Sequence, residues 1–167
     1  MTMLDISLDS DPDWDSSNWA ELARRAATSA IAESAFPGLG LGPRAVELGV
    51  RLTGDDQVRA LNAQWRGKDL ATNVLSFPLA EPGDLDDTVV GPELMLGDIV
   101  LARGVCAAEA ADKNISIQHH ASHLMIHGTL HLLGYDHHDD DAAADMEACE
   151  VRALARLGIA DPYEAGR

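Results

Sequence analysis

The chain has 167 residues, a formal net charge of −16 and 46% hydrophobic residues. A chain of this size and hydrophobic content can bury a core without disulfides, so we expect a single domain spanning residues 1–167. The net charge argues against tight, sequence-blind binding to nucleic acid, because such binding needs clustered Lys and Arg that release counterions. The sequence has neither a signal peptide nor a run of about 18 apolar residues, which predicts a cytoplasmic protein without membrane contact.

The first third of the chain reads as strand, helix, strand. Residues 4–8 alternate apolar and polar side chains, the pattern of a half-buried strand. Residues 18–34 show helical spacing, and Asn18 and Glu21 are placed like a capping box. Residues 46–52 alternate again and predict a second strand.

A second helix is predicted to begin after Thr53, as its N-cap, and to end at Gly67. Val58, Leu61 and Trp65 form one apolar stripe along it.

The remaining elements include two more strands, over residues 72–78 and 94–102, separated by an acidic loop at 81–92. Three further helices are predicted, over residues 103–114, 115–133 and 144–159. These elements predict an α+β (mixed α/β) fold, with a single four-stranded sheet covered by about five helices. The two cysteines, Cys106 and Cys149, are expected to be buried structural thiols rather than a disulfide.

All seven histidines lie between His119 and His138, a concentration that indicates metal binding. His123, His127 and His131 recur every four residues, so they share one helix face. The eight residues from His123 to His131 rise roughly 12 Å, which is too far for both to bind one ion. Only one adjacent pair can therefore act together.

The third ligand is predicted to follow the helix. Gly134 can end the helix and turn the chain back toward His137, which selects His127, His131 and His137 as ligands. Three neutral imidazoles leave one position of a tetrahedral Zn²⁺ open for water, as in catalytic sites, although they also suit nickel, copper or iron.

The motif HxxxHxxGxxH is similar to the metal-binding helix and turn of the metzincin proteases. Those proteases carry a Glu general base where this chain has Gly128, and this difference weakens a protease interpretation. We expect the missing side chain of Gly128 to leave room for a substrate in a cleft between the sheet and the histidine helix.

Other polar residues near the motif have less distinct roles. We expect His119, His120 and His138 to be ordinary core or surface residues. His123 either supports a ligand from behind, faces the substrate, or is a hydrogen-bonded core residue. Asp136 either orients a ligand or caps the turn, and the run Asp139–Asp141 is expected to cap the next helix.

With these motifs in view, the chain resembles the YbeY family of bacterial metal-dependent endoribonucleases that take part in ribosomal RNA maturation. The resemblance spans roughly Val46 to Leu157. It rests on LTGDDQVRALNAQWRGKD, TNVLSFP, LGDIVLA and HLMIHGTLHLLGYDH, followed by Met146 and Glu150. One departure is Ala71, at a position where the family usually has Pro.

The resemblance implies zinc-dependent cleavage of single-stranded RNA in 16S rRNA 3′-end maturation and ribosome quality control. It implies the same three histidine ligands and a functional arginine at Arg66, whose alternative role is to stabilise the end of its helix. We add Lys68, Ser76 and His123 as candidate substrate-binding residues. The expected partners are single-stranded or ribosomal RNA and the ribosome or a basic ribosomal protein, with neither DNA nor membrane.

Two other functions remain open at this stage. One is a zincin-like peptidase, which the histidine pattern favours and Gly128 opposes. The other is a non-enzymatic ribosome assembly factor, which would dock on a basic ribosomal protein and use its metal to hold the fold together.

Overall fold

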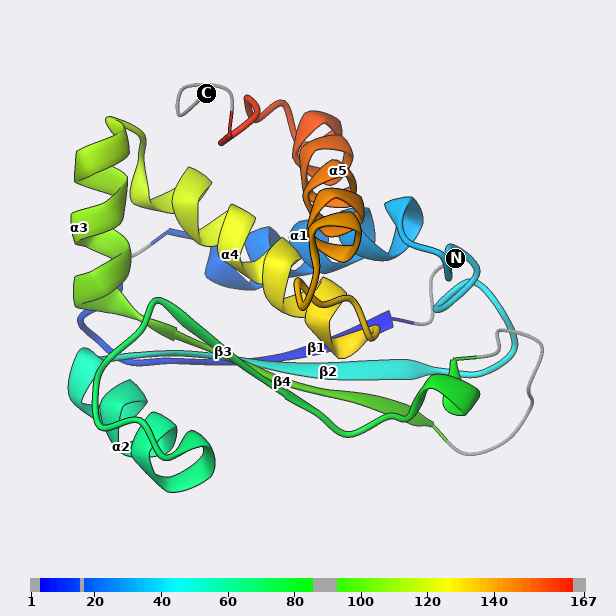
Figure 1. Cartoon of the computed structure of the whole chain (residues 1–167), viewed down its shortest axis with the longest axis horizontal. Coiled ribbons are helices and arrows are strands. Elements are labelled where there is room, and N and C mark those ends of the chain that lie inside the picture. The colour runs from blue at the N-terminus through cyan, green and yellow to red at the C-terminus, as the bar shows by residue number, and fades with distance from the viewer. Residues whose placement is uncertain (1–3, 16, 86–92, 164–167) are drawn as a thin grey trace.

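A computed structural model describes residues 4–15, 17–85 and 93–163. These residues form an α+β fold, as the sequence predicts, with helices on both faces of one sheet (Figure 1). The elements are β1 (Leu4–Ser10), α1 (Trp19–Glu33), β2 (Val46–Thr53), α2 (Asp55–Arg66), β3 (Val74–Pro78), β4 (Leu94–Ala102), α3 (Arg103–Lys113), α4 (Ile117–Leu132) and α5 (Asp140–Arg156), with a 3-10 turn at Pro82–Asp84.

The sheet has the strand order β1-β2-β4-β3. β1, β2 and β4 run parallel, whereas β3 pairs antiparallel with β4 and forms one edge. Parallel neighbours need a crossover, which α1 supplies between β1 and β2. The edge strand β3 is important for the site because α4 packs beside it.

The main core lies on the face of the sheet that α1, α4 and α5 cover, while α2 packs on the other face (Figure 1). α1 presents small buried side chains, including Ala23, Ala26 and Ala30, which allow α4 to approach closely. α4 is buried on nearly all sides, so most of its buried side chains are apolar and most of its buried polar side chains form hydrogen bonds. The site is therefore built on a rigid central helix.

The predicted ends of the elements are mostly correct. Asn18 accepts a hydrogen bond from the Glu21 backbone N–H at 3.2 Å, but the Glu21 carboxylate pairs with Arg24, so only half of a capping box forms. Gly67 ends α2 with φ +69°. The N-cap prediction for Thr53 was wrong. Thr53 is the last residue of β2, its hydroxyl donates to Asp11 at 2.6 Å, and Gly54 is the N-cap.

The apolar stripe of α2 is only partly buried. Val58 is completely buried, whereas the side chain of Trp65 is 65% exposed. Cys106 and Cys149 are buried free thiols, as predicted. Within the described ranges, no helix has the length and apolar character needed to cross a bilayer. Most of the predicted acidic loop, residues 86–92, lies outside the described residues.

Candidate metal centre

The last turn of α4 and the bend after it bring His127, His131 and His137 together. His127 and His131 are one helical turn apart, and their Nε2 atoms are 3.1 Å from each other. Gly134 then adopts φ +95°, a conformation that side chains rarely tolerate, and the chain reverses. One ligand atom from each of the three imidazoles lies within 4.8 Å of the other two.

Hydrogen bonds fix which nitrogen the two helical histidines present. His131 Nδ1 is 2.9 Å from the Tyr135 carbonyl oxygen, which can only accept, so this nitrogen carries the proton. His127 Nδ1 lies 3.4 Å from Glu150 Oε1. Both rings consequently direct Nε2 toward the space between the three histidines. This orientation is typical of histidines that bind a metal ion.

The protonation state of His131 also suits a metal ligand. Burial lowers the pKa of His131 to about 4, and the neighbouring His127 and His137 contribute to this lowering. The ring is therefore neutral at pH 7, as metal binding requires. Three imidazoles, two of them with fixed orientations, fit a Zn²⁺ ion or a similar transition metal.

Glu150 is the buried centre of the hydrogen-bond network behind these ligands. Its side chain is 1% exposed and contacts His123 Nε2 at 2.5 Å and the Tyr163 hydroxyl at 2.8 Å, in addition to His127. Burial acts to raise the pKa of Glu150, but the hydrogen bonds with His123 and His127 outweigh it and lower the pKa to about 2. Glu150 is therefore an ionised carboxylate that holds His127 from behind.

The structure gives His123 a partner in this network rather than a place among the cleft-lining residues. Its side chain is 10% exposed and contacts both Glu150 and the ring of Tyr163. His120 is buried and contacts Glu109 at 2.8 Å. His119 and His138 are on the surface, where His138 lies 3.2 Å from Asp139. Asp139 caps α5 by accepting from the Ala142 N–H, as predicted.

A cleft of about 530 Å³ opens over the three histidines, between α4 and the edge strand β3. Arg66 and Ser76 line its opposite wall. The Ser76 hydroxyl donates to the Gly128 carbonyl at 3.4 Å. Lys68 is exposed but is not among the residues that line the cleft.

The expected role of Gly128 in admitting substrate was wrong. Gly128 is buried against the sheet, and a Cβ atom there would lie 2.9 Å from Ile99 Cγ2. The missing side chain allows α4 to pack on β4 and does not widen the cleft. A Glu at this position would point at Ile99, so the metzincin general base has no equivalent here.

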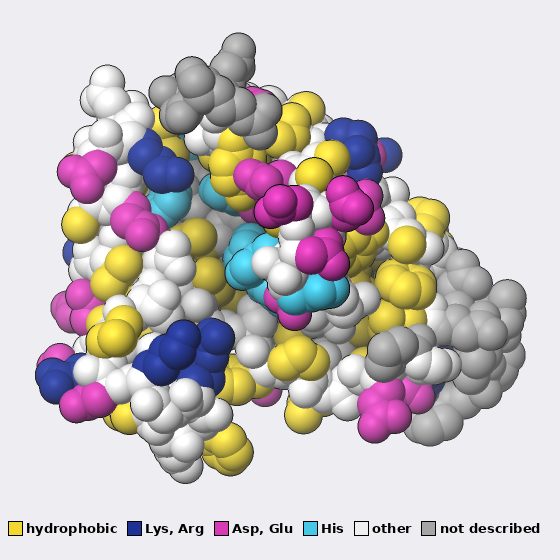
Figure 2. Space-filling view, viewed as in Figure 1, with side chains coloured by type: hydrophobic (Ala, Val, Ile, Leu, Met, Phe, Trp, Pro, Cys, Tyr) yellow, Lys and Arg dark blue, Asp and Glu magenta, His cyan; other side chains and the backbone are white. Residues whose placement is uncertain are grey.

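Charge is distributed unevenly around the site. Figure 2 shows the histidines gathered in a hollow, with Asp and Glu side chains along one side and a group of Lys and Arg side chains across from them. Asp140 and Asp141 lie in the first turn of α5, and Arg66 lies in the last turn of α2. A polyanion can therefore approach only from part of the surface.

Comparison with known proteins gives the family. A sequence profile described as endoribonuclease YbeY matches residues 7–158. The chain belongs to the YbeY family. Proteins named endoribonuclease YbeY are 48% identical in Rhizorhabdus wittichii, over 96% of this chain and 97% of that protein, and 46% identical in Zymomonas mobilis, over 96% and 93%.

A solved structure with the same fold supports the architecture of this YbeY family member. The solution structure of the protein TM1509 from Thermotoga maritima aligns with a TM-score of 0.55 and covers 92% of this chain and 91% of its own. At 23% sequence identity, this similarity shows the fold and nothing further.

Sequence reasoning gave Glu150 and Tyr163 no role in the site. For Glu150 a signal was present, because it lies four residues after the buried Met146, on the face of α5 that also carries the buried Leu154. A carboxylate on a buried helix face needs a partner. For Tyr163 no local pattern exists, since its contact with Glu150 depends on how the chain folds back after α5.

Proposed function

We propose that this chain is an endoribonuclease that hydrolyses phosphodiester bonds of single-stranded RNA at one Zn²⁺ held by His127, His131 and His137. One observation carries the proposal. Three imidazoles with nitrogens within 4.8 Å of one another share a cleft with Arg66, in a family whose members are named endoribonucleases. When bound, a metal of this kind lowers the pKa of its water and polarises a phosphate oxygen.

The protein residues have separable tasks in this proposal. Arg66 holds the scissile phosphate across the cleft, where its planar, permanently charged guanidinium can donate two parallel hydrogen bonds and stabilise the developing charge. Ser76 shares this wall and orients the substrate. Lys68, exposed just beyond α2, contacts the RNA backbone outside the cleft.

His123 acts behind the site in this scheme, through Glu150, rather than on the substrate. We assign no side chain as general base. Asp136 is the one acid among the described residues that line the cleft, and its Oδ1 already accepts the His137 backbone N–H at 2.7 Å. With no side chain assigned as general base, a metal held by His127, His131 and His137 would activate a water molecule, which would attack phosphorus while the ribose oxygen leaves and takes up a proton.

The biological role we propose is maturation of the 16S rRNA 3′ end and ribosome quality control in the cytoplasm, with residues 1–167 acting as one domain. Family membership supports this role. The net charge of −16 supports it in a second way, because an acidic surface is repelled by free nucleic acid but is attracted to a basic ribosomal protein.

The test is cleavage of a labelled single-stranded RNA by protein purified without a histidine tag, together with elemental analysis of bound metal. We expect about one zinc per chain, RNA cleavage that a chelator abolishes and zinc restores, and no digestion of casein. His131→Ala, purified in parallel, should lose both metal and cleavage. Cleavage by this variant at the wild-type rate would indicate a contaminating nuclease and contradict the proposal.

A further inference from the structure

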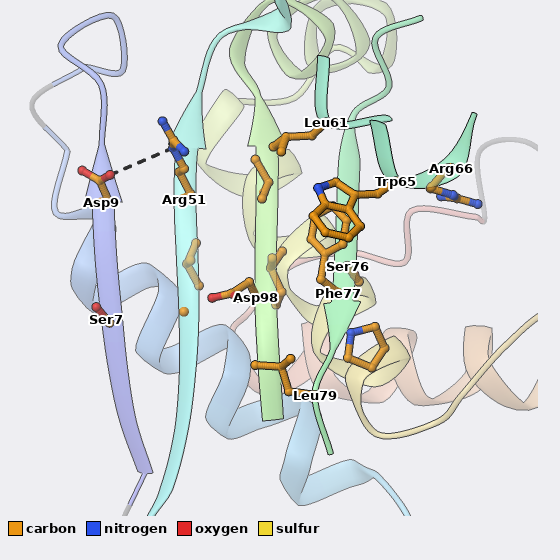
Figure 3. Close-up of a pocket in the computed structure, with 15 residues that line it drawn as sticks. Ser7, Asp9, Arg51, Leu61, Trp65, Arg66, Ser76, Phe77, Leu79 and Asp98 are labelled. Carbon is orange, nitrogen blue, oxygen red and sulfur yellow. Dashed lines mark ion pairs between the residues drawn. The ribbon is translucent and has the colours of Figure 1, made fainter. Parts of the chain in front are cut away.

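A second, larger hollow lies on the opposite face of the sheet from the metal centre. This groove has a volume of about 850 Å³, in the upper part of the roughly 300–1,000 Å³ range of pockets that hold small organic ligands. Its floor is a row of neighbours in register across the strands, Ser7, Gly49, Asp98 and Phe77. Figure 3 shows these strands with the groove residues on them.

The floor of the groove is shaped by a glycine. A Cβ atom at Gly49 would lie 2.3 Å from Asp98 Oδ1, so the gap in the row is filled by the Asp98 carboxylate. Asp98 points from β4 toward β2 and is exposed to solvent (Figure 3). The floor therefore offers a hydrogen-bond acceptor on the β2 side of β4, and Phe77 lies on the strand at the other side of β4.

An exposed tryptophan stands over this floor. Trp65 is 65% exposed, whereas Trp14 and Trp19 are each 3% exposed. Leu79, at the other end of the groove, is 61% exposed. Large apolar side chains that remain in water around a hollow mark a binding surface.

The groove is continuous with the metal cleft. Arg66, Ser76 and Pro78 line both, because β3 is the edge of the sheet and separates the two hollows. Arg66 extends beyond β3 at this edge, next to Trp65 (Figure 3). An RNA strand whose phosphate is held by Arg66 can pass around the edge of β3 and place its next nucleotides in the groove.

We propose that the groove binds the nucleotides on one flank of the scissile phosphate, with a base stacked on Trp65. This inference rests on the proposed function. A base fits the floor beside Asp98, because this carboxylate repels phosphate but accepts hydrogen bonds from the N–H groups of bases, whereas Asp9 is paired with Arg51 at 4.0 Å. Stacking on an exposed aromatic ring tolerates any base and suits a single-stranded substrate.

The first test separates stacking from simple packing by steady-state kinetics on single-stranded RNA. Trp65→Leu should raise KM about tenfold, the loss expected for one stacked base, with a much smaller change in kcat. Trp65→Phe keeps an aromatic face and should recover most of this loss. Leu41→Ala is the matched control, since Leu41 is 64% exposed outside the groove and should leave KM unchanged.

The second test uses RNA that lacks one base at successive positions on either side of the cleavage site. Loss of the stacked base should raise KM for the wild type as much as Trp65→Leu does, and should have little further effect on that variant. Metal-free protein gives an independent measurement. Because Trp14 and Trp19 are buried, RNA should quench the fluorescence of Trp65 in the wild type and should not quench Trp65→Phe.

The outcomes distinguish this inference from the proposed function. Absence of cleavage by the wild type, with Trp65 still quenched by RNA, would overturn the proposed function and support the groove as an RNA site. RNA cleavage by the wild type with an unchanged KM in Trp65→Leu and no quenching would overturn the inference. A protein partner would then be the better occupant of the groove.

Discussion

Glu150 determines which nitrogen His127 presents to the cleft, and it does so from inside the core. Its carboxylate is also held by His123 and Tyr163, so it cannot turn away without breaking three contacts. Groups that hold metal ligands in this way typically contribute about 10- to 100-fold to metal affinity. The sharpest test therefore changes Glu150 without changing its shape.

We expect Glu150→Gln to weaken metal binding by about tenfold or more, because the amide loses the charge that orients His127. Competition with a chromophoric chelator measures this affinity. Glu109→Gln is the matched control, since Glu109 contacts His120 at 2.8 Å in a similar pair that does not touch a ligand. Equal metal affinity in the two variants would show that Glu150 has only a structural role.

Arg66 is predicted to act on the scissile phosphate and to have no part in holding the metal. Arg66→Ala should lower kcat by about 100- to 1,000-fold, roughly 3–4 kcal/mol, while the zinc content stays the same. Arg66→Lys should recover little, because an ammonium group cannot donate in the paired geometry of a guanidinium.

Arg59→Ala serves as the control for Arg66, because Arg59 is on the same helix but pairs with Asp69 at 2.8 Å outside the cleft. Its kcat should stay within about twofold of the wild type. If Arg66→Ala behaves in the same way, Arg66 only stabilises the end of α2.

At the scale of elements, the bend after α4 connects backbone geometry to the metal. Gly134 has φ +95°, and a Cβ atom there would meet nothing within 4 Å, so a substitution is strained by conformation alone. Gly134→Ala should lower the free energy of unfolding by about 1–2 kcal/mol and weaken metal binding, because the bend positions His137. Thermal unfolding and chelator competition measure the two effects.

Gly83→Ala is the control for Gly134, since Gly83 is equally uncrowded but has no positive φ. Gly83→Ala should change neither the free energy of unfolding nor the metal affinity appreciably. Loss of stability without loss of metal affinity in Gly134→Ala would mean that His137 reaches the ion from more than one backbone conformation.

Local signals in the sequence predicted most elements and the three histidine ligands, because caps, breaks and helical spacing act over a few residues. The N-cap prediction for Thr53 was wrong because its hydroxyl donates a hydrogen bond to Asp11, which lies 42 residues away in the chain. Trp65 has the spacing of a buried stripe, yet it is 65% exposed because the groove separates its side chain from the sheet below. The strand order and the role of Glu150 depend on contacts between distant segments, which no local pattern encodes.

For the whole molecule, the three histidines proposed as metal ligands lie at the margin of the core. His127 and His131 are half-buried and His137 is exposed, whereas the large buried side chains pack elsewhere. We expect the metal-free protein to keep its far-ultraviolet circular dichroism and to unfold cooperatively. Zinc at about 100 times its Kd should add about 2.7 kcal/mol of stability. An unfolded metal-free protein would favour the assembly factor with a structural metal.

The charge of −16 predicts an unusually weak dependence of RNA binding on salt. If Arg66 and Lys68 make the main phosphate contacts, a plot of log affinity against log salt concentration should have a slope of about −1 to −1.5. Screening of the acidic surface makes it still shallower. A slope steeper than about −4 would point to more phosphate contacts than Arg66 and Lys68 can make.

The position of β3 at the edge of the sheet has a consequence for the form of RNA that can be cut. If the nucleotides on the two sides of the scissile bond lie on opposite faces of the sheet, the RNA must bend sharply at that bond. A base-paired duplex resists such curvature, as the persistence length of roughly 150 base pairs in DNA illustrates. Selectivity for unpaired RNA would then follow from bending stiffness, without any residue that recognises the absence of a second strand.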